Sequence, residues 1–224
     1  MPEPAPLKIT TRSGSVRVVA AAGTVLAVEG GSIELRDDGT LHIRREPSSS
    51  SIEVRCDAGT DVMVGTQSGK VELFGPLGAV RIATVSGRIR VEEAARIDVR
   101  TKSGKIDIGI CANECRIMTK SSAVHVRRAG KATVAGISGV VLLEDVRGAE
   151  VKTISGKVLL GSAGGERVSV HTVSGKVEIR VPAATRPATR LRSISGHIDC
   201  ELSQGNDFEI AVASVSGTIR VASA

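Results

Sequence analysis

The sequence predicts an all-β chain that forms a single-domain parallel β-solenoid (β-helix) of about 11–12 rungs, each of 17–21 residues. Three observations lead to this fold: an eight-residue pattern that recurs along the chain, alternating apolar residues on both sides of it, and the composition. The chain has 25 Gly, two Phe, and no Tyr or Trp, and its apolar residues are mostly Val, Ile and Ala. Branched aliphatics together with glycine favour strands and tight turns over helices.

The recurring pattern is Thr-x-Ser-Gly followed by a basic residue and a strand. It reads TKSGKIDI at 101–108, TISGKVLL at 153–160 and TVSGKVEI at 172–179. The glycine column comprises Gly14, Gly69, Gly87, Gly104, Gly139, Gly156, Gly175, Gly196 and Gly217, with Ser122 in place of one glycine. Gly31 is expected in the same column, 17 residues after Gly14. Such a regular period predicts one structural unit per repeat.

Apolar residues alternate with polar ones on each side of the Ser-Gly step, which is typical of strands with one buried face. One such unit cannot bury its apolar face alone, but stacked units can, with in-register parallel strands about 4.8 Å apart. The predicted inner column consists of Val71, Ile89, Ile106, Val124, Val141, Val158, Val177, Ile198 and Ile219. A β-sandwich of short hairpins is the alternative, but hairpins do not explain a period with identical corners.

The Ser-Gly step is interpreted as a corner of the solenoid. Glycine supplies the positive φ that a sharp corner needs, so Ser122 predicts an altered corner. The Thr and Ser hydroxyls are expected to point inward and to bond to one another and to turn amides. A catalytic serine is not predicted, because no His or Asp partner recurs with it.

Residues 1–6 are expected to be a flexible leader and residues 7–224 the solenoid, with irregular rungs over 7–65 and regular Ser-Gly rungs over 66–224. Right-handed winding is the default for parallel crossovers. No signal peptide or membrane span is recognised, so a cytoplasmic protein is expected, with a non-classical export route left open. Cys111 and Cys115 lack a second ligand pair, so no metal site is predicted, and Cys200 is expected in a core position.

The segment SIEVRCDAGTDVMVGTQSGKVEL, followed by VRIATVSGRIRV and the later T-x-SG-x-V units, resembles the bacterial putative-adhesin β-strand-repeat family, a family of unknown function. The resemblance covers about residues 7–223. It implies the repeat fold and an adhesin-like role, and it carries over no catalytic residues.

Outward positions next to the corner suggest a basic stripe that could meet a polyanion such as nucleic acid or anionic lipid. Its candidate residues are Lys70, Arg88, Lys102, Lys105, Lys120, Lys152, Lys157 and Lys176. The alternative interpretation is that these cations keep the strand surface soluble. The formal net charge of +6 permits an anionic partner without requiring one.

A second outward set is aliphatic: Ile137, Val140, Leu142, Ile154 and Leu159. Contiguous exposed aliphatics often mark an interface, although another segment of the chain could cover them. The final strand also ends without a cap, which predicts end-to-end or lateral self-association.

The leading functional hypothesis is therefore a non-catalytic scaffold that binds a protein partner or itself, and the alternative is a polyanion-binding surface protein. No enzyme activity and no cofactor are predicted. Glu178 and Asp199 stack as two carboxylates, but neither an aromatic platform nor a third acid accompanies them, so a glycosidase is not favoured.

Overall fold

The computed structural model describes residues 4–47 and 49–223, so the first three residues of the predicted leader lie outside the described residues. All regular secondary structure in the described part of the chain is strand, and most pairings are parallel. The predicted all-β, mostly parallel fold is confirmed. The chain divides into two compact units, unit 1 (Met1–Ala112) and unit 2 (Asn113–Ala224). The assignment of residues 7–224 to a single domain stays a prediction.

Unit 1 begins with six short strands: β1 (Leu7–Thr11), β2 (Ser15–Ala20), β3 (Ala27–Glu29), β4 (Gly31–Leu35), β5 (Leu41–Arg45) and β6 (Ser51–Cys56). The strand β7 (Val62–Ala135) follows and begins in this unit. β1 pairs in parallel with both β5 and β7, and β2 pairs in parallel with both β6 and β7. The first two strands of the chain therefore lie inside the sheet: β1 lies between β5 and β7, and β2 lies between β6 and β7.

The irregular amino-terminal region differs from the sequence prediction at Gly31. β4 and β3 pair antiparallel with β5 and β6, so Gly31 lies in an antiparallel ladder opposite Arg45 and is not a corner glycine. The hairpin-like excursion of residues 21–40 interrupts the 17-residue period here. Phe74 is only half-buried, and its ring lies between the guanidinium groups of Arg17 and Arg90, 5.2 and 5.8 Å from their Cζ atoms.

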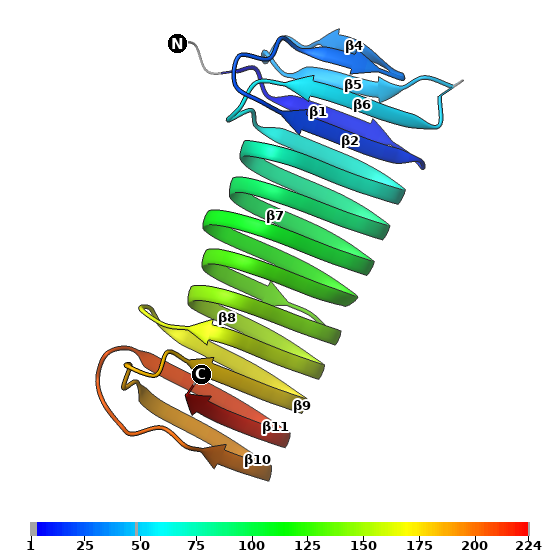
Figure 1. Ribbon diagram of the computed structural model, residues 1–224. Helices are drawn as coiled ribbons and strands as arrows, with labels where there is room; N and C mark the ends of the chain where they lie inside the picture. The colour runs from blue at the N-terminus through cyan, green and yellow to red at the C-terminus, as the bar shows by residue number, and fades with distance from the viewer. Residues whose placement is uncertain (1–3, 48, 224) are drawn as a thin grey trace. The chain divides into compact units, whose positions relative to one another are not determined.

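Unit 2 contains the end of β7 and the strands β8 (Ser138–Ala163), β9 (Val168–Val181), β10 (Ala188–Cys200) and β11 (Glu209–Ser223). All four ladders of this unit are parallel and in register at the Ser-Gly step: Ser121 pairs with Ser138, Ser155 with Ser174, Ser174 with Ser216, and Ser195 with Ser216. The order in space is β7-β8-β9-β11-β10, so the last strand of the chain lies between β9 and β10 (Figure 1). Sequence order had predicted β11 at the end of the sheet.

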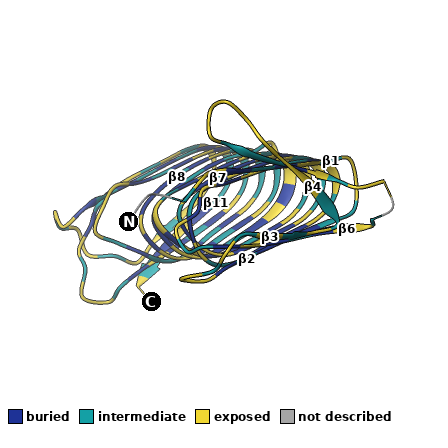
Figure 2. Cartoon of the chain, turned by 90° about the horizontal axis from the view of Figure 1, so that it is seen from above, coloured by how far each residue is buried: buried dark blue, intermediate teal, exposed yellow. Residues whose placement is uncertain are grey.

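The core consists of the inner residues of each strand, and buried and exposed positions alternate along the chain (Figure 2). In β8, for example, Val141, Leu143 and Val146 are buried while Glu144 and Asp145 are exposed. The predicted inner column is buried throughout except at Ile198, in β10. Cys200 is also exposed, so its predicted core position is wrong, because no strand covers the outer edge of β10.

Most corner glycines adopt the predicted positive φ, between +128° and +148° at Gly69, Gly87, Gly104, Gly139, Gly156, Gly175 and Gly217. Gly196, in the edge strand β10, does not adopt it, so the prediction is wrong at this corner. The corner glycines also stack so closely that a Cβ on one would overlap the carbonyl oxygen of the next, as Gly156 meets Gly139 and Gly175 meets Gly156. Ser122 has no positive φ, and its Oγ lies 2.6 Å from Thr119 Oγ1, so its corner is altered as predicted.

Hydroxyls bond to one another as predicted around Ser122, where Thr119 contacts Ser122 and Ser138 donates to Ser121 Oγ at 3.2 Å, but at other corners they bond to a carbonyl. At five corners the buried or half-buried threonine donates to the carbonyl of the serine two residues later, at 3.0 Å for Thr84, Thr101 and Thr153 and 3.2 Å for Thr66 and Thr172. Ser214 does the same with Ser216, at 3.1 Å. The Ser-Gly serines themselves are half-buried or exposed. These bonds lie inside each corner and satisfy a carbonyl that the bend takes away from the ladder.

Replacing Thr172 by valine is expected to lower the free energy of unfolding by about 1 kcal/mol, because valine keeps the shape but leaves the Ser174 carbonyl without its donor. Urea denaturation followed by circular dichroism measures the change. Thr172→Ser is the matched control, since it keeps the hydroxyl. A larger loss for serine than for valine would show that the methyl group, and not the hydrogen bond, stabilises this corner.

Candidate interaction surfaces

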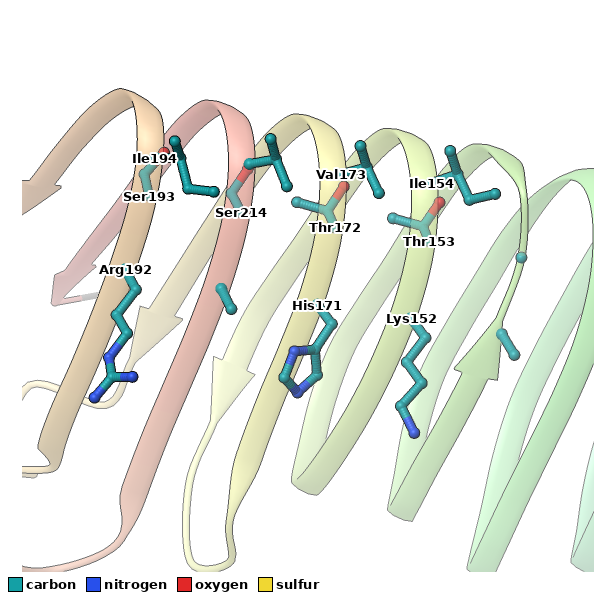
Figure 3. Close-up of a pocket in the computed structure, with 14 residues that line it drawn as sticks. Lys152, Thr153, Ile154, His171, Thr172, Val173, Arg192, Ser193, Ile194 and Ser214 are labelled. Atoms are coloured by element: carbon teal, nitrogen blue, oxygen red, sulfur yellow. The ribbon is translucent and has the colours of Figure 1, made fainter.

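Unit 2 contains a groove of about 630 Å³ that crosses β8, β9, β11 and β10 (Figure 3). Its position follows from the registers, because Thr153, Thr172, Ser214 and Ser193 pair in turn across the four strands. Since side chains alternate along a strand, the residues before and after each of these hydroxyl residues point outward. The groove therefore has three parallel rows: hydroxyls along the middle, one row before them and one row after them.

The row after the hydroxyls is apolar and is named the apolar ladder: Ile154, Val173, Val215 and Ile194, in spatial order. All four side chains are exposed, from 43% at Val215 to 82% at Ile194. They stack at the spacing of parallel strands, as the labelled members show in Figure 3. Contiguous exposed aliphatics on neighbouring strands are uncommon on a protein that has no partner.

The row before the hydroxyls carries three basic or titratable side chains, Lys152, His171 and Arg192 (Figure 3). In the ladders Ala213 pairs with both His171 and Arg192 and so lies between them. Lys152 donates to Glu150 at 2.7 Å, and this hydrogen bond holds the pKa of the Glu150 carboxyl below its ordinary value. His171 Nε2 lies 3.1 Å from Ser169 Oγ. The groove is thus apolar on one side and cationic on the other.

The five aliphatic residues predicted as an interface lie on two sides of the Ser-Gly corner, and their role as one interface stays a prediction. Ile137 and Ile154 share a column before the corner, where the Ile154 amide donates to the Ile137 carbonyl at 3.2 Å. Val140, Leu142 and Leu159 lie after the corner; Val140 is exposed, and the two leucines are half-buried. The groove instead joins Ile154 to Val173, Val215 and Ile194, which the sequence prediction missed.

A sequence signal for the apolar ladder exists. The variable position of the Thr-x-Ser-Gly pattern reads Gln67, Val85, Lys102, Lys120 and then Ile137, Ile154, Val173, Ile194 and Val215. Five consecutive branched aliphatics at one outward position would have identified this surface. Within one repeat each of these aliphatic residues lies between the corner serine and a threonine, serine or glycine, so the surface is visible only when one position is compared across all repeats.

The eight residues of the predicted basic stripe fall into three columns. Lys70, Arg88, Lys105, Lys157 and Lys176 follow the corner glycine, Lys102 and Lys120 occupy the variable position, and Lys152 lines the groove. Among the described residues, ion pairs along one strand join Lys70 to Glu72 at 2.8 Å, Lys152 to Glu150, and Lys176 to Glu178. Lys176 also holds the pKa of Glu178 below its ordinary value. These carboxylates offset part of the positive charge on which the polyanion hypothesis depends.

Neither a metal site nor a membrane helix is found in the part of the chain that the structure describes. No three His, Cys, Asp or Glu side chains gather there as potential metal ligands. No helix among the described residues is long and apolar enough to cross a membrane. Glu178 and Asp199, the stacked carboxylates of the sequence, are separated by β11, whose Arg220 lies opposite both in the ladders.

Comparison with known proteins agrees with the repeat architecture. The model of the Toastrack DUF4097 family matches residues 32–223. The chain belongs to this family. No curated protein matches the Toastrack chain described here.

Two solved structures share the fold of this Toastrack chain. A putative adhesin from Bacteroides fragilis is 11% identical, with a TM-score of 0.52 over 98% of this chain and 93% of its own. A putative adhesin from Parabacteroides distasonis is also 11% identical, with a TM-score of 0.54 over 93% of this chain and 92% of its own. At these identities the likeness concerns the fold. It agrees with the sequence resemblance to the putative-adhesin repeat family and gives the polyanion alternative no support.

Proposed function

We propose that this Toastrack chain is a non-catalytic scaffold that binds a partner protein through the groove of unit 2. The observation that carries the proposal is the apolar ladder, four exposed branched side chains on neighbouring strands edged by a cationic row. A pocket for a small substrate needs convergent catalytic groups, whereas this surface offers a long row of apolar side chains. Such a row fits an extended partner surface better than a small molecule.

The fold suits this role. We propose that the repeats form a right-handed β-solenoid of about 11–12 rungs, in which each rung fixes the position of the next. Parallel strands hold their outward side chains about 4.8 Å apart, and the in-register ladders fix which residues are neighbours. The apolar ladder is therefore rigid before a partner binds, which lowers the entropic cost of binding.

The groove also indicates the chemistry of its partner. Apolar side chains of the partner would contact the ladder, and carboxylates beside them would meet Lys152, His171 and Arg192. The adhesin-like descriptions of the two structural neighbours are compatible with a protein partner. An acidic, aliphatic-rich segment of a protein is thus the proposed occupant.

Selection of random phage-displayed peptides on the whole chain tests this function. We expect the enriched peptides to combine aliphatic or aromatic residues with Asp or Glu, and to bind Val173→Ser about tenfold more weakly, or about 1.4 kcal/mol, by isothermal titration calorimetry. Val140→Ser is the matched control, because Val140 is 43% exposed and Val173 47%, but Val140 lies after the corner and outside the groove. Its affinity is expected to equal that of the unmodified chain.

Two outcomes would contradict the proposal. Selected peptides that bind Val173→Ser and the unmodified chain equally would place the binding surface elsewhere. Peptides that are merely acidic, with affinity lost at high salt and on changing Lys105, Lys157 and Lys176 to Glu, would indicate the basic stripe instead.

A further inference from the structure

The strand β10 is the uncovered edge of the sheet in unit 2. Among the described strands it pairs with β11 alone, because β11 lies between it and β9 (Figure 1). After β9 the chain forms β10 and leaves one strand position open between them. It then returns through residues 201–208 and forms β11 in that position. The consequence is an edge strand of 13 residues that bends at the Ser195–Gly196 corner into two arms.

Core positions are exposed on this edge. Ile198 is 38% exposed, whereas Ile219 beside it in β11 is fully buried. Cys200 is exposed beside the buried Val221, and Leu191 is half-buried beside the buried Val212. The inner column of the sheet therefore ends in three apolar side chains that no strand covers.

The backbone of β10 also has unused hydrogen-bonding groups. The amide of Ala188 donates to Phe208 and that of Glu201 to Val221, so these two residues face β11. In a parallel ladder alternate residues face opposite sides. Leu191 and Ser193 on the first arm, and Ile198 and Cys200 on the second, therefore present their amides and carbonyls away from β11.

The first arm of β10 is complementary to the second arm of another copy of β10. If a second copy of β10 runs antiparallel to the first, with a two-fold axis through the Ser195–Gly196 corner, Leu191 lies opposite Cys200 of the second copy and Ser193 opposite Ile198. All four have outward-facing backbone groups, as an antiparallel hydrogen-bonded pair requires. Their side chains also lie on the inner side of the strand, so the apolar column continues into the second copy.

The same register pairs opposite charges. Arg192 lies opposite Asp199 of the second copy, and Arg190 lies opposite Glu201. In the described part of this chain no carboxylate lies within ion-pair distance of Arg192, while Arg220 holds Asp199 at 3.4 Å and Glu201 at 2.8 Å. The two-fold axis generates each pair twice, so four complementary pairs flank the corner.

We propose that β10 is the site at which two copies of this chain form a two-fold dimer by antiparallel strand pairing. An interface of this kind uses the same surface on both copies and closes on itself, so it gives a dimer and no filament. The proposal goes beyond partner binding in the groove, because it depends on the edge of β10 and not on Ile154 or Val173, which belong to inner strands.

A charge exchange tests the register. Arg192→Glu places two acids opposite each other in the homodimer, and Asp199→Lys places two bases opposite each other. We expect each variant to be monomeric at concentrations where the unmodified chain sediments as a dimer, with the dissociation constant of the dimer raised at least about tenfold per pair of repulsive contacts. An equal mixture of the two variants is expected to restore the dimer, because both repulsions then become attractions.

Lys157→Glu is the matched control, since it makes the same charge change on an exposed residue of β8 and should leave the dimer intact. Circular dichroism and the melting temperature show that each variant is folded. Alkylation of Cys200 gives a second readout: it should be faster in Arg192→Glu than in the unmodified chain, because the dimer covers this thiol. A monomeric unmodified chain, a dimer that survives Arg192→Glu, or a mixture that stays monomeric would each overturn the proposal.

Discussion

Replacing Gly156 by alanine is expected to lower the free energy of unfolding by about 3 kcal/mol or more. Two effects add at this corner. Its φ of +137° is strained for any residue with a Cβ, and the Cβ itself would overlap the Gly139 carbonyl oxygen on the neighbouring strand. The obstacle is the backbone of the neighbouring strand, which is hydrogen-bonded to the strand of Gly156 in a parallel ladder. The two strands therefore cannot move apart at this corner without losing hydrogen bonds.

Two glycines of the same unit separate these effects. Gly165 has a φ of +101° but open space around its Cβ position, so Gly165→Ala carries the backbone strain alone and should cost about 1 kcal/mol. Gly136 has no positive φ and meets its nearest atom at 3.4 Å, so Gly136→Ala should be close to neutral or slightly stabilising. Urea denaturation measures all three. Equal losses at Gly156 and Gly165 would show that the stacking of the corners contributes nothing.

The strands and corners could be predicted from the sequence because the residues that determine them lie within a single repeat. The Ser-Gly steps gave the glycine column, and alternation gave the inner residues such as Val158 and Leu160, which are buried as expected. These features are local to one repeat, and a period of 17–21 residues then determines which repeats stack. The match of the Toastrack family over residues 32–223 agrees with this reading of the pattern.

The order of the outer strands could not be predicted in the same way. Both β1 and β11 lie between two other segments, and nothing in the local pattern distinguishes a strand that continues the stack from one that returns to fill a gap. Ile198 and Ile219 have the same pattern around them, yet one is exposed and the other buried. The difference arises because β10 lies at the edge of the sheet and β11 lies between β9 and β10, an order that the local pattern does not encode.

The groove was only half predicted for a related reason. Ile154 was identified because it is exposed next to other aliphatics in the sequence, but Val173, Val215 and Ile194 become its neighbours only through the registers of three ladders. A surface of a repeat protein runs across the repeats, so its residues are far apart in the chain. The function of such a surface depends on one position repeated many times, and single residues identify it poorly.

Replacing Leu143 by alanine is expected to lower the free energy of unfolding by about 3 kcal/mol, because its side chain is fully buried in unit 2 and the strands on either side cannot close the cavity. Leu142, one residue earlier in β8, is half-buried and faces outward, opposite His125 in the ladder. Leu142→Ala is therefore the matched control, with the same atoms removed and an expected loss below about 1 kcal/mol.

Urea denaturation of the two variants measures their free energies of unfolding and so tests whether inward and outward side chains alternate in β8. A large loss at Leu143 with a small one at Leu142 means that the inner column stabilises the stack and that Leu142 remains free for contacts on the outer face. Similar losses would instead mean that Leu142 is covered in the folded protein. In that case the aliphatic residues after the corner would belong to an interface, as the sequence alone had suggested, and the binding surface would extend beyond the groove.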